Sequence, residues 1–365
     1  MSNLVDVSQL APTQLPVDWY LDPHILDLEK RLLFDRGPGY AGHEVMLPNV
    51  GDYYVPEWMN GAKVLVRNDN GIELLSNVCR HRQSLLLKGH GNVRNIVCPI
   101  HRWTYDLNGA LLGAPHFPEN PCLNLGITPL QSWNGLLFEG KRNVSRDLAN
   151  LGVLGNFNFS GHVLERVETE QYACNWKTFI EVYLEDYHVN TFHPGLGNFV
   201  NTAELQWEFG DWYNVQTVGI NQGLERPGTP VYARWHEQLL QQAGNKAPAF
   251  GAIWMLYYPN IMLEWYPHVL IVSTIWPLAP ERCMNVVEFY YPEDIALFER
   301  EFIEAEQAAY HETAIEDDEI CGLMTAGRRA LYERGINETG PYQSPMEDGM
   351  VHFHEFLRRE IGPHV

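Results

Sequence analysis

Two short cysteine–histidine pairs constrain this sequence more than any other feature. Cys79 and His81 form a C-x-H pair, and Cys98 and His101 form a C-x-x-H pair, with sixteen residues between the two pairs. Two thiolates can bind one iron of a [2Fe-2S] cluster while two neutral imidazoles bind the other. The same side chains could bind a structural zinc ion, but zinc fingers usually place both cysteines first and both histidines second. The pattern therefore favours an iron–sulfur cluster.

Length and charge narrow the class of protein. The chain has 365 residues, a formal net charge of −21, and 45% hydrophobic and 12% aromatic residues. This length is long for one hydrophobic core and indicates two domains. The acidic balance argues against nucleic acid or an anionic membrane as a partner.

The sequence also argues against export and membrane insertion. The N-terminus lacks a charged-then-apolar signal pattern. The most apolar region, residues 250–279, is interrupted by Pro259, Glu264, Pro267 and His268, so it does not predict a membrane helix. The cysteines outside the two pairs have no framework spacing, which favours free thiols in a reducing cytoplasm. These are Cys122, Cys174, Cys283 and Cys321.

Residues 41–150 predict a small all-β domain. Apolar runs at 62–66 and 72–75 predict two strands, and the Asn70-Gly71 step between them predicts a hairpin turn. A second turn at Asn134-Gly135 leads into a strand-like run at 136–139. Both cysteine–histidine pairs fall within this stretch, so we expect them on its loops.

Residues 151–365 predict a larger α+β domain. The runs 252–258, 261–266 and 269–275 predict three strands that pair as an antiparallel meander. Helical spacing follows at 293–310 and 317–334, and a sheet followed by helices is the α+β order. Residues 1–40 are partly helical in pattern, and we expect this N-terminal segment to pack on the larger domain.

A second metal-binding pattern lies in the larger domain. His188 and His193 are five residues apart at the end of a helix-like run, so they converge if the helix loosens after His188. Two imidazoles and one carboxylate form the facial triad that binds Fe(II) and leaves positions open for O₂ and substrate. A purely structural role for both histidines is the alternative.

Together these motifs resemble those of the Rieske non-haem iron oxygenases, and the likeness extends over most of the chain. It implies a [2Fe-2S] cluster in the small domain and a mononuclear Fe(II) in a helix-grip-like catalytic domain with an antiparallel sheet. The implied cluster ligands are Cys79, His81, Cys98 and His101, and the implied iron ligands include His188 and His193.

The resemblance also implies roles for acidic residues. Glu185, three residues before His188, matches the carboxylate that links the two metal centres; most of the family has Asp there, and Glu resembles the choline, carnitine and glycine-betaine branch. The third iron ligand is expected at the start of a C-terminal helix, where Asp317 has Ile320 three positions later. Asp318 is the competing candidate, and an acidic helix N-terminus favoured by the macrodipole is the alternative to either.

The function implied is that of a terminal oxygenase that uses O₂ and electrons from NAD(P)H. A separate reductase or ferredoxin would supply the electrons, because no glycine-rich dinucleotide fingerprint occurs here. The family also implies a homotrimer. The expected reaction is mono- or dioxygenation of an aromatic or other small organic substrate, as in aromatic hydrocarbon catabolism. Alternatives are demethylation or C–N cleavage of a quaternary ammonium compound, a Rieske electron carrier, and a zinc-stabilised binding module.

Several positions depart from the family pattern or leave two interpretations open. Gln83 replaces the usual glycine after the first pair, and Ile100 and Arg102 replace the usual aromatic residue and glycine around the second histidine. Four aromatic residues near the predicted meander form either a core stripe or a cage for a quaternary ammonium, with Glu264 as a countercharge. These are Trp254, Tyr258, Trp265 and Trp276.

Overall fold

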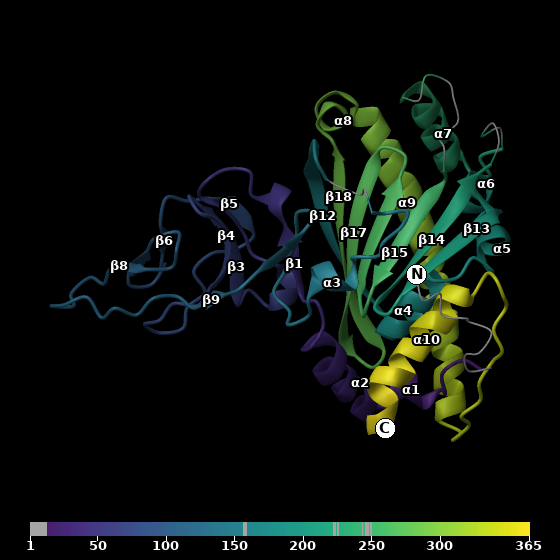
Figure 1. Cartoon of the computed structure of the whole chain (residues 1–365), viewed down its shortest axis with the longest axis horizontal. Coiled ribbons are helices and arrows are strands. Elements are labelled where there is room, and N and C mark those ends of the chain that lie inside the picture. The colour runs from purple at the N-terminus through teal and green to yellow at the C-terminus, as the bar shows by residue number, and fades with distance from the viewer. Residues whose placement is uncertain are drawn as a thin grey trace. The chain divides into compact units, whose positions relative to one another are not determined.

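The computed structural model describes residues 13–155, 159–221, 224, 226–242, 244, 248 and 250–365. The chain forms two compact units (Figure 1). The smaller unit consists of Pro38–Arg146 and Phe157–Phe159, and the larger of Met1–Gly37, Asp147–Asn156 and Ser160–Val365.

Three antiparallel sheets build the smaller unit. The hairpin of β3 (Lys63–Asn68) and β4 (Gly71–Ser76) lies inside a five-stranded sheet of order β5-β2-β3-β4-β9. Gly71 has a φ of +136°, which glycine adopts more readily than other residues, so the predicted hairpin turn is confirmed. The other sheets have the orders β1-β11-β10 and β6-β7-β8. The remaining elements are β1 (Tyr40–His43), β2 (Asp52–Tyr54), β5 (His90–Asn92), β6 (Ile96–Val97), β7 (Thr104–Tyr105), β8 (Leu111–Gly113), β9 (Ile127–Thr128), β10 (Gln131–Trp133), β11 (Leu136–Phe138) and α3 (Val144–Asp147).

A seven-stranded antiparallel sheet is the framework of the larger unit, with the order β12-β18-β17-β16-β15-β14-β13. The predicted meander is β15 (Ala252–Tyr257), β16 (Ile261–Tyr266) and β17 (Val269–Ala279), which pair as neighbours. Most of their apolar side chains are buried, because the strands lie in the middle of the sheet. The α+β prediction is confirmed. The outer strands are β12 (His162–Tyr172), β13 (Val200–Gly210), β14 (Tyr213–Ile220) and β18 (Arg282–Pro292).

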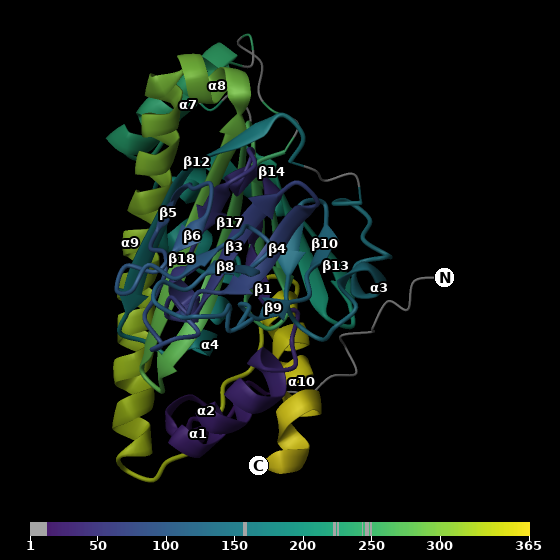
Figure 2. The same ribbon diagram turned by 90° about the vertical axis from the view of Figure 1, so that its left-hand side faces the viewer.

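Helices pack around this sheet, and Figure 2 shows the longest, α9 (Arg300–Tyr332), running along one side of it. The sequence predicted two helices, but the structure has the short α8 (Glu293–Phe298) and then one continuous helix of 33 residues. No glycine or proline lies between Tyr310 and Asp317 to end α9. The other helices are α1 (Asp18–Leu21), α2 (Pro23–Glu29), α4 (Trp176–Tyr183), α5 (Val189–Phe192), α6 (Leu196–Phe199), α7 (Pro230–Gln242) and α10 (Asp348–Ile361).

The position of Asp317 in α9 corrects one prediction. The acidic run at 316–319 lies in the middle of the helix and not at its N-terminus. The helix macrodipole acts within the first and last turns, so it does not explain these carboxylates. The prediction of a helix start at Asp317 was wrong because the helical pattern continues through Thr313 and Ala314.

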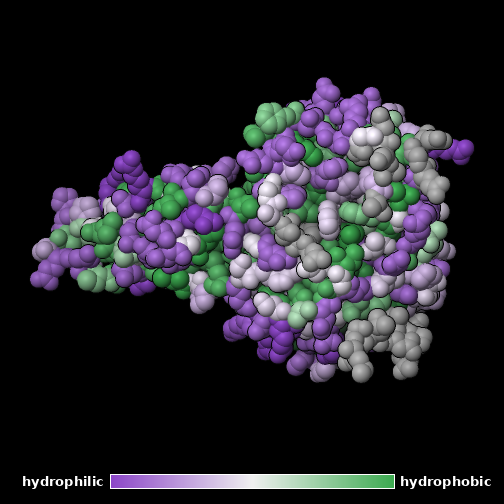
Figure 3. All heavy atoms as spheres, turned by 45° about the horizontal axis from the view of Figure 1, so that its top comes forward, coloured by the Kyte–Doolittle hydropathy of each residue, from purple (hydrophilic) through white to green (hydrophobic). Residues whose placement is uncertain are grey.

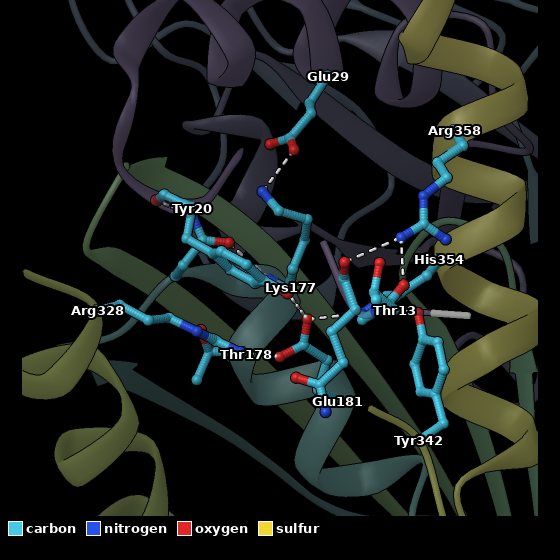
Figure 4. Close-up of polar contacts among 12 residues, drawn as sticks. Thr13, Tyr20, Glu29, Lys177, Thr178, Glu181, Arg328, Tyr342, His354 and Arg358 are labelled. Carbon is cyan, nitrogen blue, oxygen red and sulfur yellow. Dashed lines mark hydrogen bonds and ion pairs between the residues drawn. The ribbon is translucent and has the colours of Figure 1, made fainter. Parts of the chain in front are cut away.

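A buried polar network joins α1, α4, α9 and α10 (Figure 4). The carboxylate of Glu181 accepts hydrogen bonds from Tyr20 at 2.5 Å, Arg328 at 2.7 Å and His354 at 2.9 Å. Burial opposes its ionisation, but Arg328 and His354 hold the pKa of Glu181 at about 2. The network therefore contains a charged carboxylate on α4 that accepts hydrogen bonds from three other helices of the larger unit, α1, α9 and α10.

Hydrophilic residues cover much of the surface seen in Figure 3, in keeping with the net charge of −21. Within the described part of the chain, no helix combines the length and the apolar character needed to cross a bilayer.

Candidate metal and substrate sites

The two cysteine–histidine pairs lie on matching loops of the smaller unit. Cys79 and Cys98 are buried, and the rings of His81 and His101 lie together with their centroids 4.6 Å apart. In each loop, the backbone N–H four residues after the cysteine donates to the cysteine carbonyl, at 3.1 and 3.2 Å. The donors of these two hydrogen bonds are the N–H groups of Gln83 and Arg102. The four predicted side chains therefore lie on two turns of similar geometry.

Gln83 and Arg102 occupy the positions where the sequence departs from glycine. Both have left-handed backbones, with φ values of +53° and +61°. Glycine adopts this conformation without strain, whereas residues with a Cβ do so at a cost. Both loops nevertheless close through the same hydrogen bond, so the two substitutions preserve the turn geometry.

Aromatic side chains pack directly on the pairs. Trp103 stacks on His81 with a centroid distance of 5.1 Å and an interplanar angle of 7°. The hydroxyl of Tyr105 lies 3.6 Å from Sγ of Cys79. Nδ1 of His81 is buried and has no hydrogen-bond partner in the described chain. Two buried thiols beside two imidazoles, with an unpartnered ring nitrogen, fit a [2Fe-2S] cluster.

The second group of predicted residues meets in the larger unit, between α4 and α9. His188 and His193 flank the single-turn helix α5, which turns both imidazoles toward the same point. Their Nε2 atoms are 2.9 Å apart, and Oδ1 of Asp317 lies 3.5 Å from the first and 3.0 Å from the second. The ligand atoms of these three residues all lie within 4.8 Å of one another.

The other nitrogen of each imidazole contacts a carboxylate. Nδ1 of His188 lies 2.5 Å from Glu185, and Nδ1 of His193 lies 2.7 Å from Glu316. An imidazole that donates its Nδ1–H to a carboxylate presents a bare lone pair at Nε2. Two such lone pairs and a buried oxygen of Asp317 without a hydrogen-bond partner in the described chain converge here. This donor set fits a divalent iron held by two imidazoles and one carboxylate.

The structure separates the two competing aspartates. Asp317 faces both histidines, whereas Asp318, the next residue of α9, is exposed to solvent. Successive helical residues are about 100° apart around the axis, so both aspartates cannot face one point. Glu316, on the side of His193, is a site residue that the sequence analysis missed.

A cavity of about 130 Å³ lies beside His188, His193 and Asp317. One wall is a single face of α9, where the lining residues recur three or four positions apart. Strands β15 to β18 contribute much of the remaining wall. The α9 residues are Glu306, Ala309, Tyr310, His311, Thr313, Ala314, Asp317 and Cys321.

Glu264 on β16 lines this cavity as a buried carboxyl group. The hydroxyls of Tyr266 and Tyr310 donate to its two oxygens at 2.9 and 3.3 Å, and Trp254 donates to the Tyr266 hydroxyl at 2.8 Å. Burial raises the pKa of Glu264 to about 7, and the charge of Asp317 adds to this effect. Among the described residues, none of its hydrogen-bond partners is basic.

Among the described residues that line the cavity, Trp254 is the single member of the four aromatic residues singled out in the sequence. Tyr258 is buried elsewhere and hydrogen-bonds to His352, whereas Trp276 is half-buried and donates to the hydroxyl of Thr274. Trp265 follows Glu264 directly and so points to the other face of β16. The remaining aromatic lining comes from residues that the sequence analysis did not select: Tyr172, Phe179, Tyr183, Phe199, Tyr232, Trp235, Tyr266 and Tyr310.

Comparison with known families agrees with the geometry of both sites. The model of the ring hydroxylating alpha subunit (catalytic domain) matches residues 158–362, and that of the Rieske [2Fe-2S] domain matches residues 42–133. This chain is a Rieske oxygenase alpha subunit. The resemblance inferred from the motifs is therefore confirmed.

Two relatives of this oxygenase are named putrescine 2-hydroxylase. The protein of Ralstonia nicotianae is 61% identical over 98% of this chain and 99% of its own length. The protein of Bordetella bronchiseptica is 54% identical over 99% of this chain and 88% of its own length. The chloroplastic choline monooxygenase of Atriplex hortensis is 27% identical over 99% of this chain and 82% of its own length. These names refer to amines, so they do not support the predicted aromatic substrate.

Solved structures confirm the fold. The quaternary ammonium Rieske monooxygenase CntA, in complex with an inhibitor, superimposes with a TM-score of 0.77 over 97% of each chain at 18% identity. Naphthalene 1,2-dioxygenase from Rhodococcus superimposes with a TM-score of 0.69 over 96% of this chain and 95% of its own.

Membership of this family settles the cofactors. The oxygenase binds a [2Fe-2S] cluster in its Rieske domain and a mononuclear iron in its catalytic domain, and it receives electrons from a reductase. The zinc-stabilised module and the electron carrier, two of the alternatives from the sequence, are therefore wrong. The enzyme is an oxidoreductase that acts with O₂ on a small molecule.

Proposed function

We propose that this oxygenase hydroxylates putrescine, a linear four-carbon diamine, at its second carbon. Glu264 is the feature that carries the proposal, because it places a buried carboxyl group among aromatic side chains of the cavity that also holds His188, His193 and Asp317. A buried carboxylate without a cation is costly, and an ammonium group of the substrate would supply that cation. The two relatives named putrescine 2-hydroxylase support the same substrate.

The aromatic lining supports a cationic substrate in a second way. Trp254, Tyr266 and Tyr310 surround the Glu264 carboxyl group. Aromatic faces attract ammonium groups, and this attraction strengthens when water is excluded. An aromatic hydrocarbon carries no positive charge and would leave Glu264 without a counterion.

We propose that the metal ligands are those on which the geometry converges. Cys79, His81, Cys98 and His101 would hold the cluster, and His188, His193 and Asp317 the mononuclear iron. When bound, the iron activates O₂ with electrons delivered by the cluster. We further propose a homotrimer in which Glu185 links the iron of one subunit to the cluster of its neighbour.

The chain's own residues would then position the substrate and the ligands. Glu264 holds one ammonium group, and its tyrosine partners fix the orientation of that carboxylate. Glu185 and Glu316 fix the ring orientation of the two histidines by accepting their Nδ1–H groups. The overall reaction replaces a C–H bond at carbon 2 with C–OH. It consumes O₂, two electrons and two protons, and it releases the second oxygen atom as water.

The test is product analysis with purified enzyme, NADH, a reductase of a Rieske system and ¹⁸O₂. We expect 2-hydroxyputrescine with a single ¹⁸O atom by mass spectrometry. Choline and carnitine serve as comparison substrates. Demethylated or C–N-cleaved products from these compounds, with no hydroxylated putrescine, would overturn the proposal and favour quaternary ammonium oxidation.

A matched pair of variants tests the role of Glu264. Glu264→Gln should lower kcat/KM for putrescine at least ~30-fold, because it removes a desolvated countercharge. Glu288→Gln is the control: Glu288 is also buried and accepts a hydrogen bond from a tyrosine two residues later, Tyr290, but it does not line the cavity. Equal losses in the two variants would assign Glu264 a structural role only.

A further inference from the structure

We propose that Glu306 binds the second ammonium group of the substrate and thereby selects diamines over monoamines. This inference rests on the proposed function and deepens it. Glu306 lies on α9, lines the same cavity as Glu264, and is buried with 4% of its surface exposed. Its hydrogen-bond donor is the hydroxyl of Tyr291.

The neighbouring carboxylates show why Glu306 differs. Glu165 pairs with Arg300, and Glu168 pairs with Arg166 and His311. Those acidic side chains therefore have cations supplied by the protein.

Among the residues that the structure describes, no basic side chain forms an ion pair with Glu306 or Glu264. In the described chain, the recorded hydrogen-bond donors to both are tyrosine hydroxyls. Asp186, a third buried carboxyl group in the lining, accepts from the amide of Gln216 and lies close to the iron-site residue His188. Away from the iron site, Glu264 and Glu306 remain as two buried carboxyl groups without basic partners, and they predict a ligand that brings two positive charges.

Tyr310 connects the two carboxyl groups within the cavity lining. Glu306 lies four residues, ~6 Å along the helix axis, before Tyr310, and Tyr310 donates to Glu264. Burial raises the pKa of Glu306 to about 8, and the negative charges of Glu264, Glu165 and Glu168 add to this effect. Asp317 lies nearly two further turns along α9. The order along the cavity is therefore iron site, Glu264 and Glu306.

The arrangement also explains selectivity. A monoamine bound at Glu264 would place a methyl group beside the Glu306 carboxyl group, which would then remain without a counterion. A site built for two polar groups rejects an analogue that lacks one of them, because a buried partner is left unsatisfied. Putrescine should therefore be preferred over 1-aminobutane, which has the same carbon chain and a single amine.

The experiment compares putrescine with 1-aminobutane in the wild-type holoenzyme and in Glu306→Gln. We expect the ratio of their kcat/KM values to fall at least tenfold in Glu306→Gln. Glu304→Gln is the control, since Glu304 is half-exposed on the same helix and pairs with Arg300 and Arg234. Its ratio should stay within twofold of wild type. Equilibrium dialysis with labelled putrescine should show the same loss of binding without turnover.

The outcomes separate this inference from the proposed function. If wild type hydroxylates putrescine and Glu306→Gln keeps the wild-type ratio, Glu306 is not the second site and the proposed function stands. If wild type hydroxylates no amine, the proposed function itself fails. Should Glu306→Gln not fold, competition in wild type decides: equal inhibition constants for 1-aminobutane and for non-reacting diamines of the same length would overturn the inference.

Discussion

The carboxylate of Glu316 lies 2.7 Å from Nδ1 of His193. The next residue, Asp317, faces Nε2 of the same imidazole. One turn of α9 thus contacts both nitrogens of one histidine. We expect Glu316→Gln to lower the affinity for mononuclear iron roughly 10- to 100-fold, because a ligand histidine loses its orienting carboxylate. Iron titration of the apoprotein measures this. Glu319→Gln, exposed on the same helix, is the control; equal affinities in the two variants would contradict the assignment.

The competing aspartates can be separated by metal content. Asp317→Ala should lose the mononuclear iron and keep the [2Fe-2S] cluster, since the cluster residues lie in the other unit. Asp318→Ala should retain both. Iron and acid-labile sulfide per chain, with the EPR signal of the reduced cluster, report the two centres separately. Full iron content in Asp317→Ala would exclude Asp317 as a ligand.

Glu185 should matter for electron transfer more than for metal binding. Its carboxylate accepts from both the backbone N–H and Nδ1 of His188. Glu185→Gln keeps a hydrogen-bonding group of the same size, so we expect both metals to remain while product formed per NADH consumed falls roughly 10- to 100-fold. Single-turnover reduction of the iron by the cluster is the direct measurement. Wild-type coupling in this variant would remove Glu185 from the electron path.

Binding of a diamine should release protons. Without a cation, burial raises the pKa of Glu264 to about 7 and that of Glu306 to about 8. A bound dication favours both carboxylates, so putrescine should bind more tightly as the pH rises from about 6 to about 8. Calorimetry in two buffers of different ionisation enthalpy measures the released protons. Identical heats in both buffers would show that the two groups are already ionised.

The raised pKa values of Glu264 and Glu306 also determine how the free energy of unfolding changes with pH. The folded protein keeps these two protons at pH values where the unfolded chain, with an ordinary glutamate pKa of 4.5, has lost them. Their contribution therefore lowers the free energy of unfolding as the pH rises from about 4.5 to 8. Putrescine should oppose this loss.

Breaking the buried network around Glu181 should destabilise the larger unit. Arg328→Met removes the cation that pairs with Glu181 and leaves a buried carboxylate behind, which should cost roughly 3–5 kcal/mol of unfolding free energy. Arg329→Met, one residue later, breaks an exposed pair with Glu281 and should cost about 1 kcal/mol or less. Urea unfolding of the two variants tests the difference; equal losses would show that burial of the pair is irrelevant.

The residues proposed to bind metal could be selected from the sequence because each pair is local. Two residues separate Cys79 from His81 in number, and five separate His188 from His193. Spacing alone therefore indicates that the members of each pair share a site. The cavity was less predictable because its walls come from distant strands and one face of α9. Glu306, Tyr310 and Asp317 follow helical spacing, but the sequence analysis placed a break between the last two and so lost the pattern.

The length of α9 has a consequence for how this enzyme could acquire a new substrate. One uninterrupted helix carries Glu306, Tyr310, Asp317 and Arg328. Each residue along this helix adds a rise of ~1.5 Å and a rotation of about 100°, so the relative positions of the four side chains are fixed in these steps. An inserted or deleted residue would rotate the charge-binding end away from the metal-binding end by more than a quarter turn. The distance between the two ends of the site can therefore change only in whole-residue steps. Selection for a longer or shorter substrate must exchange side chains upon α9, because its register cannot be adjusted gradually.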